Sequence, residues 1–121
     1  VFFADDQANR ITKFIDETYG VKPDFPWKDD NGVFRHLDNN KWFSLIMCVS
    51  LDALLKNGDN RKLNIINLKI DTSKRDELYE IDGIYPAFHM NHKTWISVVL
   101  DDTICDDKII ELIQSSFDLT K

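Results

Sequence analysis

The sequence predicts a single α+β domain, in which an antiparallel sheet of four to five strands carries helices packed on one face. A chain of 121 residues with 43% hydrophobic positions is large enough to bury a core. Helix-type apolar spacing occurs near both ends of the chain, and several strand-like segments lie between them. The connections between those strands are too short for parallel crossovers. We therefore treat residues 1–121 as one domain, with the first and last helices on the same face.

The first half of the chain predicts one helix and then a hairpin. The helix begins after Asp5 or Asp6 and stops at Gly20, and its apolar stripe is Ala8, Ile11, Phe14 and Ile15. Two prolines then favour extended chain in residues 21–27. Strands are expected over 33–37 and 41–49, joined by a tight turn at Asp38-Asn39-Asn40.

The second half alternates short helical and extended segments. A short helical turn and a loop are expected in 50–61, and a strand follows in 63–70. Asp71-Thr72-Ser73 predicts the cap of a short helix that ends near Ile81. A strand over 94–100 and a helix over 106–117 complete the chain.

Strand alternation divides these side chains between two sheet faces. A two-residue turn at Asn39-Asn40 would place Phe34 opposite Leu45, and the helix-covered face would take Phe43, Leu45, Met47 and Val49. The far face would collect Arg35, Trp42, Ser44, Asn67, Lys69, Trp95 and Ser97. At least one of the two tryptophans should then be substantially exposed. Two interpretations remain: a loop or another domain covers this face, or it is a binding platform.

The segment YPAFHMNHKTW, residues 85–95, concentrates polar and aromatic side chains. His89 and His92 lie three apart, and His36 is a possible third ligand, but no carboxylate or thiol lies close enough in sequence to predict a zinc site. No nucleophile–histidine arrangement or phosphate-binding glycine motif indicates an enzyme. We interpret the segment as a shaped loop that brings His89 and Asn91 to the rim of the far face, with Phe88 and Met90 as anchors.

Charge and hydropathy narrow the class of protein. The net charge of −6 argues against a generic nucleic-acid binder, although residues 33–69 hold six Lys or Arg against three Asp. No apolar run is long enough to cross a membrane, and no signal peptide is visible, so a cytoplasmic protein is expected. The chain begins without methionine, which suggests a fragment of a longer chain.

Six segments in order resemble the MmcQ/YjbR family: DFPW, VFRH, NNKWFSLIM, IINLKID, YPAFHMN and KTWISVVLD. The resemblance runs from about Gln7 to Thr120 and implies a CyaY-like fold and a DNA-binding function, with no enzyme activity and no cofactor. The opening ADDQANRI is similar to longer members with a preceding domain. Where the family pattern has a lysine and a histidine, this sequence has His92 and Thr94, which weakens a phosphate-contact role.

The sequence thus predicts a non-enzymatic binding domain without a bound metal or cofactor. Its partner is expected to be DNA, bound weakly and in a salt-dependent way, or else a protein or the preceding domain. A continuous basic stripe would favour DNA, and an apolar patch with a neutral rim would favour a protein. The candidate binding residues are Arg35, Lys41, Trp42, Asn67, Lys69, His89, Asn91, Lys93 and Trp95.

Overall fold

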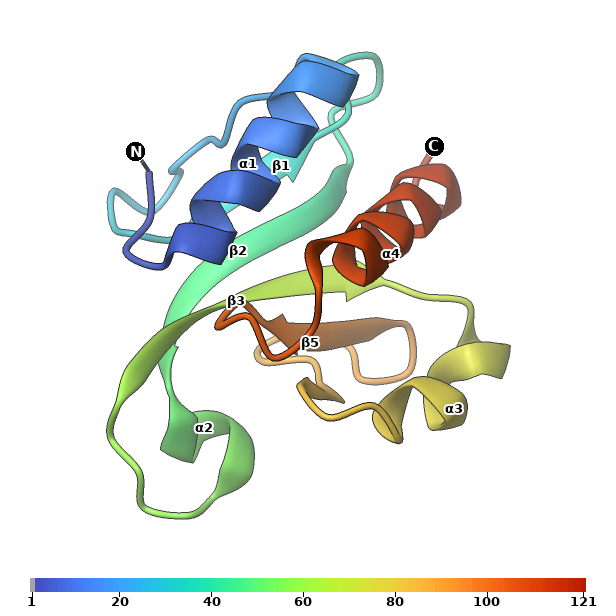
Figure 1. Ribbon diagram of the computed structural model, residues 1–121. Helices are drawn as coiled ribbons and strands as arrows, with labels where there is room; N and C mark the ends of the chain where they lie inside the picture. The colour runs from blue at the N-terminus through green and yellow to red at the C-terminus, as the bar shows by residue number, and fades with distance from the viewer. Residues whose placement is uncertain (1) are drawn as a thin grey trace.

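The computed structural model describes residues 2–121 and confirms the α+β class. Five antiparallel strands form one sheet in the order β1-β2-β3-β5-β4 (Figure 1). The elements in chain order are α1 (Asp6–Tyr19), β1 (Gly32–Arg35), β2 (Trp42–Ser50), α2 (Leu51–Leu55), β3 (Lys62–Lys69), the 3₁₀ turn η1 (Thr72–Lys74), α3 (Arg75–Tyr79), β4 (Ile84–Pro86), β5 (Trp95–Val99) and α4 (Asp106–Leu119). The sequence did not predict β4, because Pro86 and the residues after it favour a loop.

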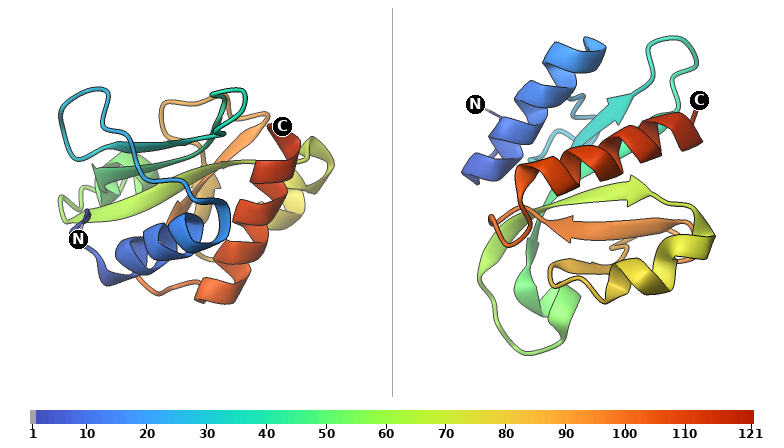
Figure 2. Two further views of the ribbon diagram at one scale, coloured as in Figure 1. Left: turned by 90° about the horizontal axis from the view of Figure 1, so that it is seen from above. Right: turned by 45° about the vertical axis from the view of Figure 1, so that its right-hand side comes forward.

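The two long helices lie on the same face of the sheet, as expected (Figures 1 and 2). The stripe of α1 buries Ala8, Ile11 and Ile15, and Gly20 ends the helix in the left-handed conformation with φ 69°. Helix α4 buries Ile109, Leu112 and Ile113 against the same core. The sheet contributes Ile66, Leu68, Ile96 and Val98 to this core, which matches the alternation expected for β3 and β5.

The register of the β1–β2 hairpin corrects the expected division of β2 between the two faces. Phe34 lies opposite Ser44, not Leu45, and the register shifts before Arg35, which lies opposite Trp42. Phe43 is therefore the extra residue of a β-bulge. Phe43 still faces the helices, but Leu45, Met47 and Val49 belong to the far face, and Ser44 is buried on the helix side. The reason is a longer turn, closed by His36 N–H to Lys41 O at 2.8 Å.

A hydroxyl from α4 lies at this bulge. Ser116 Oγ accepts from the Lys69 N–H (2.9 Å) and donates to the Phe43 carbonyl (2.6 Å), so it takes the place of a direct bond between β2 and β3. One turn later, Thr120 donates to the Ser116 carbonyl (2.8 Å) and contacts His36 Nε2 (2.6 Å). Because the Thr120 proton is used in this way, His36 donates from Nε2. The bulge is thus built by side chains far away in sequence.

The far face also carries a core, although a smaller one. Seven side chains form it: Val33, Leu45, Met47, Val49, Leu63, Ile65 and Val99. Leu51 and Leu54 of α2 pack against this cluster, as do Tyr85 and Phe88. Helix α2 therefore lies on the far face, whereas α1 and α4 share the other face as expected. A loop thus covers part of the far face, as one of the two interpretations expected, and leaves another part open.

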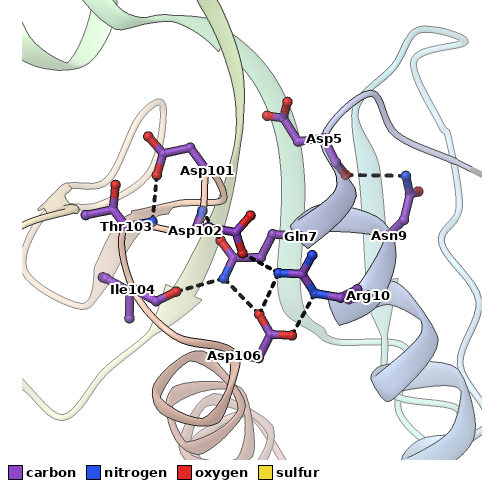
Figure 3. A network of polar contacts seen from close by, with 9 residues as sticks. All are labelled: Asp5, Gln7, Asn9, Arg10, Asp101, Asp102, Thr103, Ile104 and Asp106. Atoms are coloured by element: carbon purple, nitrogen blue, oxygen red, sulfur yellow. Dashed lines mark hydrogen bonds and ion pairs between the residues drawn. The ribbon is translucent and has the colours of Figure 1, made fainter.

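A polar network ties α1 to the connection between β5 and α4 (Figure 3). Gln7, 1% exposed, donates to the Ile104 carbonyl (2.7 Å) and accepts from the Asp102 N–H (2.9 Å). Arg10 pairs with Asp102 and with Asp106, and its hydrogen bonds hold the pKa of Asp106 below the ordinary value. The sequence indicates only turn and cap residues at these aspartates. Their second role, in joining the two helices, depends on tertiary proximity.

Candidate binding groove

The loop after β4 crosses the far face and is held there by a closed set of hydrogen bonds. Ser97 donates to Asn67 Oδ1 (2.5 Å), Asn67 Nδ2 donates to the Phe88 carbonyl (2.9 Å), and the Phe88 N–H donates to Ser97 Oγ (2.9 Å). Asn67 and Ser97 are both fully buried. Every polar atom named here has a partner, so the three residues form a buried latch without unmet polar groups.

Beside this latch the far face opens into a groove of about 290 Å³. Three side chains of β2 form its floor: Trp42, Leu45 and Met47. The segment after the first helix supplies one wall, with Trp27, Asp29 and Asn31. The loop fixed by the latch supplies the other, with His89 and Met90. In Figure 2, left, the loops around residues 25–31 and 88–94 lie on the side of the sheet away from α1 and α4.

Aromatic rings dominate one end of the groove. Trp27 and Trp42 meet edge to face, with centroids 5.8 Å apart and an interplanar angle of 90°. The Arg35 guanidinium lies 5.8 Å from the Trp42 ring centroid and pairs with Asp24 at 3.2 Å. Trp27 is 49% exposed, whereas Trp42 is partly buried. The groove therefore presents one accessible indole beside a second that already holds a cation.

Each wall is fixed in an unusual backbone conformation. Lys28, next to Trp27, has φ 57°, and His89 has φ 59°. Non-glycine residues in this left-handed region are uncommon, and they cluster at functional sites because surrounding contacts must hold them. Asn31 accepts a hydrogen bond from the Cys48 N–H (3.2 Å), which anchors the first wall to β2. Both walls are thus tied to the sheet rather than free.

The structure brings several of the predicted site residues to one end of the far face. Register places Arg35 opposite Trp42 and Lys69 opposite Trp95, all four partly buried. His89 is exposed at the groove. Three further candidates are exposed in loops next to the strands: Lys41, Asn91 and Lys93. The side chain of Asn91 accepts from the Lys93 N–H (2.9 Å), which is a turn contact.

Two of the expectations for this face are corrected. Asn67 does not lie on an accessible surface, because the latch buries it completely. Neither Trp42 nor Trp95 is substantially exposed, and Trp27 and Arg35 pack against the ring of Trp42. The exposed tryptophan is Trp27, which sequence reasoning missed. The DFPW segment was a usable signal, because Pro26 favours a turn, and a tryptophan in a turn outside the strands is not buried by the sheet.

The three histidines do not gather. His36 is 3% exposed and lies on the helix side, where its ring centroid is 5.1 Å from that of Phe43 and 4.2 Å from that of Phe117. Burial lowers the pKa of His36. His89 and His92 are exposed, and His89 lines the groove on the far face. Within residues 2–121, no group of three or more His, Cys, Asp or Glu side chains is arranged to hold a metal ion.

Comparison with known proteins places this chain in a family. The YjbR family model matches residues 16–119, and the chain belongs to the YjbR family. It is 39% identical to the uncharacterized protein YyaQ of Bacillus subtilis (strain 168) over 113 residues, which are 92% of this chain and 95% of YyaQ. The expected preceding domain stays a prediction.

Solved structures share the architecture. A Pseudomonas syringae protein seen in a crystal is 36% identical, with a TM-score of 0.88 over 93% of this chain and 97% of that one. A solution NMR structure of a protein from the same organism is 34% identical in sequence, with a TM-score of 0.83 over 94% of this chain and 92% of that one. Deinococcus radiodurans protein DR2400, at 24% identity, supports the fold alone, with a TM-score of 0.70 over 93% and 76%. Within residues 2–121, the helices are too short or too polar to span a membrane.

Proposed function

We propose that this YjbR domain is a non-enzymatic binding module that takes a side chain of a protein partner into the groove between Trp27 and Met90. The observation that carries this proposal is the groove itself: two indoles and two thioethers, on a floor of β2, between walls that hydrogen bonds fix to the sheet. Tryptophan and methionine are enriched at protein interfaces, and methionine adapts to varied partners.

The size of the groove favours a single side chain over a cofactor. Pockets for drug-sized ligands typically measure about 300–1,000 Å³, and this groove, at about 290 Å³, lies at the lower limit. An anchor residue from a peptide segment would fill it, while the flanking segment would contact the exposed surface of Trp27. Such central anchors supply most of the affinity of small interfaces.

Nucleic acid is the weaker candidate, because the described lining of the groove contains no Lys or Arg that could contact phosphates. Arg35 is paired with Asp24 and packed on Trp42, and Asn67 is inaccessible. Lys41 and Lys93 remain exposed, and the whole chain carries a net charge of −6. The groove is apolar, and the polar residues in its lining are Asp29, Asn31 and His89. This composition fits a protein partner better than DNA, which would require a basic stripe.

The test is to select binders from a phage-displayed random peptide library, and to titrate the protein with labelled duplex and single-stranded DNA across a salt series. We expect enriched peptides that bind the wild type and lose binding to Trp27→Ala, whereas Trp95→Ala, outside the groove, serves as the matched control. DNA should bind weakly, with a slope of about −0.9 per neutralised phosphate in log K against log salt. The proposal would be refuted if the selected peptides lost binding only to Trp95→Ala, or if DNA bound tightly and no peptide bound.

A further inference from the structure

We propose that the residue recognised by the groove is a cation, a lysine or arginine side chain in a basic peptide segment of the partner protein. This inference rests on the proposed function and adds the chemistry of the ligand. Three independent features of the groove support it: the faces of its indoles, an unpaired carboxylate at its rim, and the absence of Lys and Arg from its described lining.

The first feature is the pair of rings. Indole faces attract cations more strongly than the faces of other aromatic side chains. The molecule already shows this at Trp42, whose ring holds the Arg35 guanidinium at 5.8 Å from the centroid. Trp27 lies perpendicular to Trp42 and is 49% exposed, so its ring remains available to a second cation that enters from solvent.

The second feature is Asp29. Both of its carboxylate oxygens accept hydrogen bonds from Asn31, from the N–H at 2.9 Å and from Nδ2 at 3.3 Å. Asn31 is itself bonded to the Cys48 N–H of β2, so the carboxylate is oriented at the rim. Among residues 2–121, no ion pair involves Asp29. It therefore offers a fixed negative charge beside the indoles.

The third feature is the charge and polarity of the rest of the lining. Leu45, Met47 and Met90 suit the methylene stem of a long cationic side chain, which packs on apolar surface while its head reaches polar groups. Two cations lie close by, but Arg35 is neutralised by Asp24, and Lys28 is exposed outside the described lining. A net charge of −6 also attracts basic segments over a distance.

The experiment uses capped pentapeptides Gly-Ala-X-Ala-Gly, in which X is lysine, arginine, norleucine or glutamate. Binding is followed by NMR through the indole N–H signals of the three tryptophans, and Trp95 is the internal control. We expect the lysine and arginine peptides to shift the signals of Trp27 and Trp42, with affinities about three- to tenfold above that of norleucine. The glutamate peptide should bind most weakly.

Two variants sharpen the result. Asp29→Asn should remove most of the preference for lysine over norleucine, while Asp30→Asn, an exposed neighbour outside the groove, should preserve it. Equal or tighter binding of norleucine at the same two indoles would overturn the cation proposal and leave the binding groove intact. If no peptide shifts the Trp27 or Trp42 signals, the proposed function fails as well.

Discussion

The two faces of the sheet are covered by different means. The helix side buries twenty apolar side chains beneath α1, α4 and neighbouring segments, and its aromatic residues stack closely, as Tyr19 and Phe117 do at 3.9 Å between centroids. The far side buries seven, both counts taken over residues 2–121, and two loops and the short α2 cover only part of it. Helices bury a whole face because their stripes are continuous, whereas loops leave gaps between them. Stability therefore resides mainly on the helix side, and the far side has room for a ligand.

The largest effect is expected from the core on the helix side. Phe43 is fully buried and contacts the rings of Tyr19, Phe34, His36 and Phe117. Phe43→Ala should lower the free energy of unfolding by about 3–5 kcal/mol, because it leaves a cavity that the sheet cannot close. Urea denaturation measures this loss. A loss no larger than that of Trp95→Ala, a half-buried aromatic on the far face, would contradict the comparison between the faces.

A smaller effect is expected at the latch, which fixes the loop without much apolar burial. Asn67→Ala removes the donor to the Phe88 carbonyl and the acceptor of the Ser97 hydroxyl. Leaving such buried groups without partners costs about 1–3 kcal/mol. Amide exchange should accelerate more at Phe88 than at Ile113 in α4. Equal acceleration at both positions would show that the latch belongs to the global core.

Much of the fold could be predicted, because it follows from local patterns. The stripe of α1, the stop at Gly20 and the alternation of β3 depend on residues near one another in sequence. The assignment of the β2 side chains to the two sheet faces could not be predicted. It depends on the bulge at Phe43, which is held by Ser116 of α4. The groove was missed for a similar reason: it forms where the walls around Trp27 and His89 meet, 62 residues apart in sequence.

The buried His36, on the helix side, should make the stability of the protein depend on pH just below neutrality. Burial lowers the pKa of His36 from its ordinary 6.5, and the charges of Lys121 and Lys41 lower it further, whereas Asp38 and a backbone hydrogen bond to Phe117 raise it. The unfolded chain therefore binds a proton more readily than the folded one. Stability should be fully present above pH 6.5 and decrease as pH falls from there through the folded pKa.

The measurement is a series of urea denaturation curves between neutral and mildly acidic pH. His36→Gln should be less stable at neutral pH and lose less on acidification over this range. His89→Gln is the matched control, because that ring is exposed on the far face and should leave the pH dependence of the wild type in place. An unchanged acid response in His36→Gln would contradict the assignment.

The smallest effect on stability is expected at Trp27, where the effect on binding should be largest. About half of Trp27 is exposed, and its ring meets that of Trp42 edge to face, so Trp27→Ala removes less buried surface than Phe43→Ala does. The free energy of unfolding should fall by about 1 kcal/mol, which is the order of one aromatic pair. The thermal unfolding midpoint should therefore fall only slightly, while the peptides selected on the wild type lose their binding. Trp42→Ala removes the floor as well and should reduce both stability and binding. Trp27 would be part of the core rather than the groove if its alanine variant unfolded as readily as Phe43→Ala.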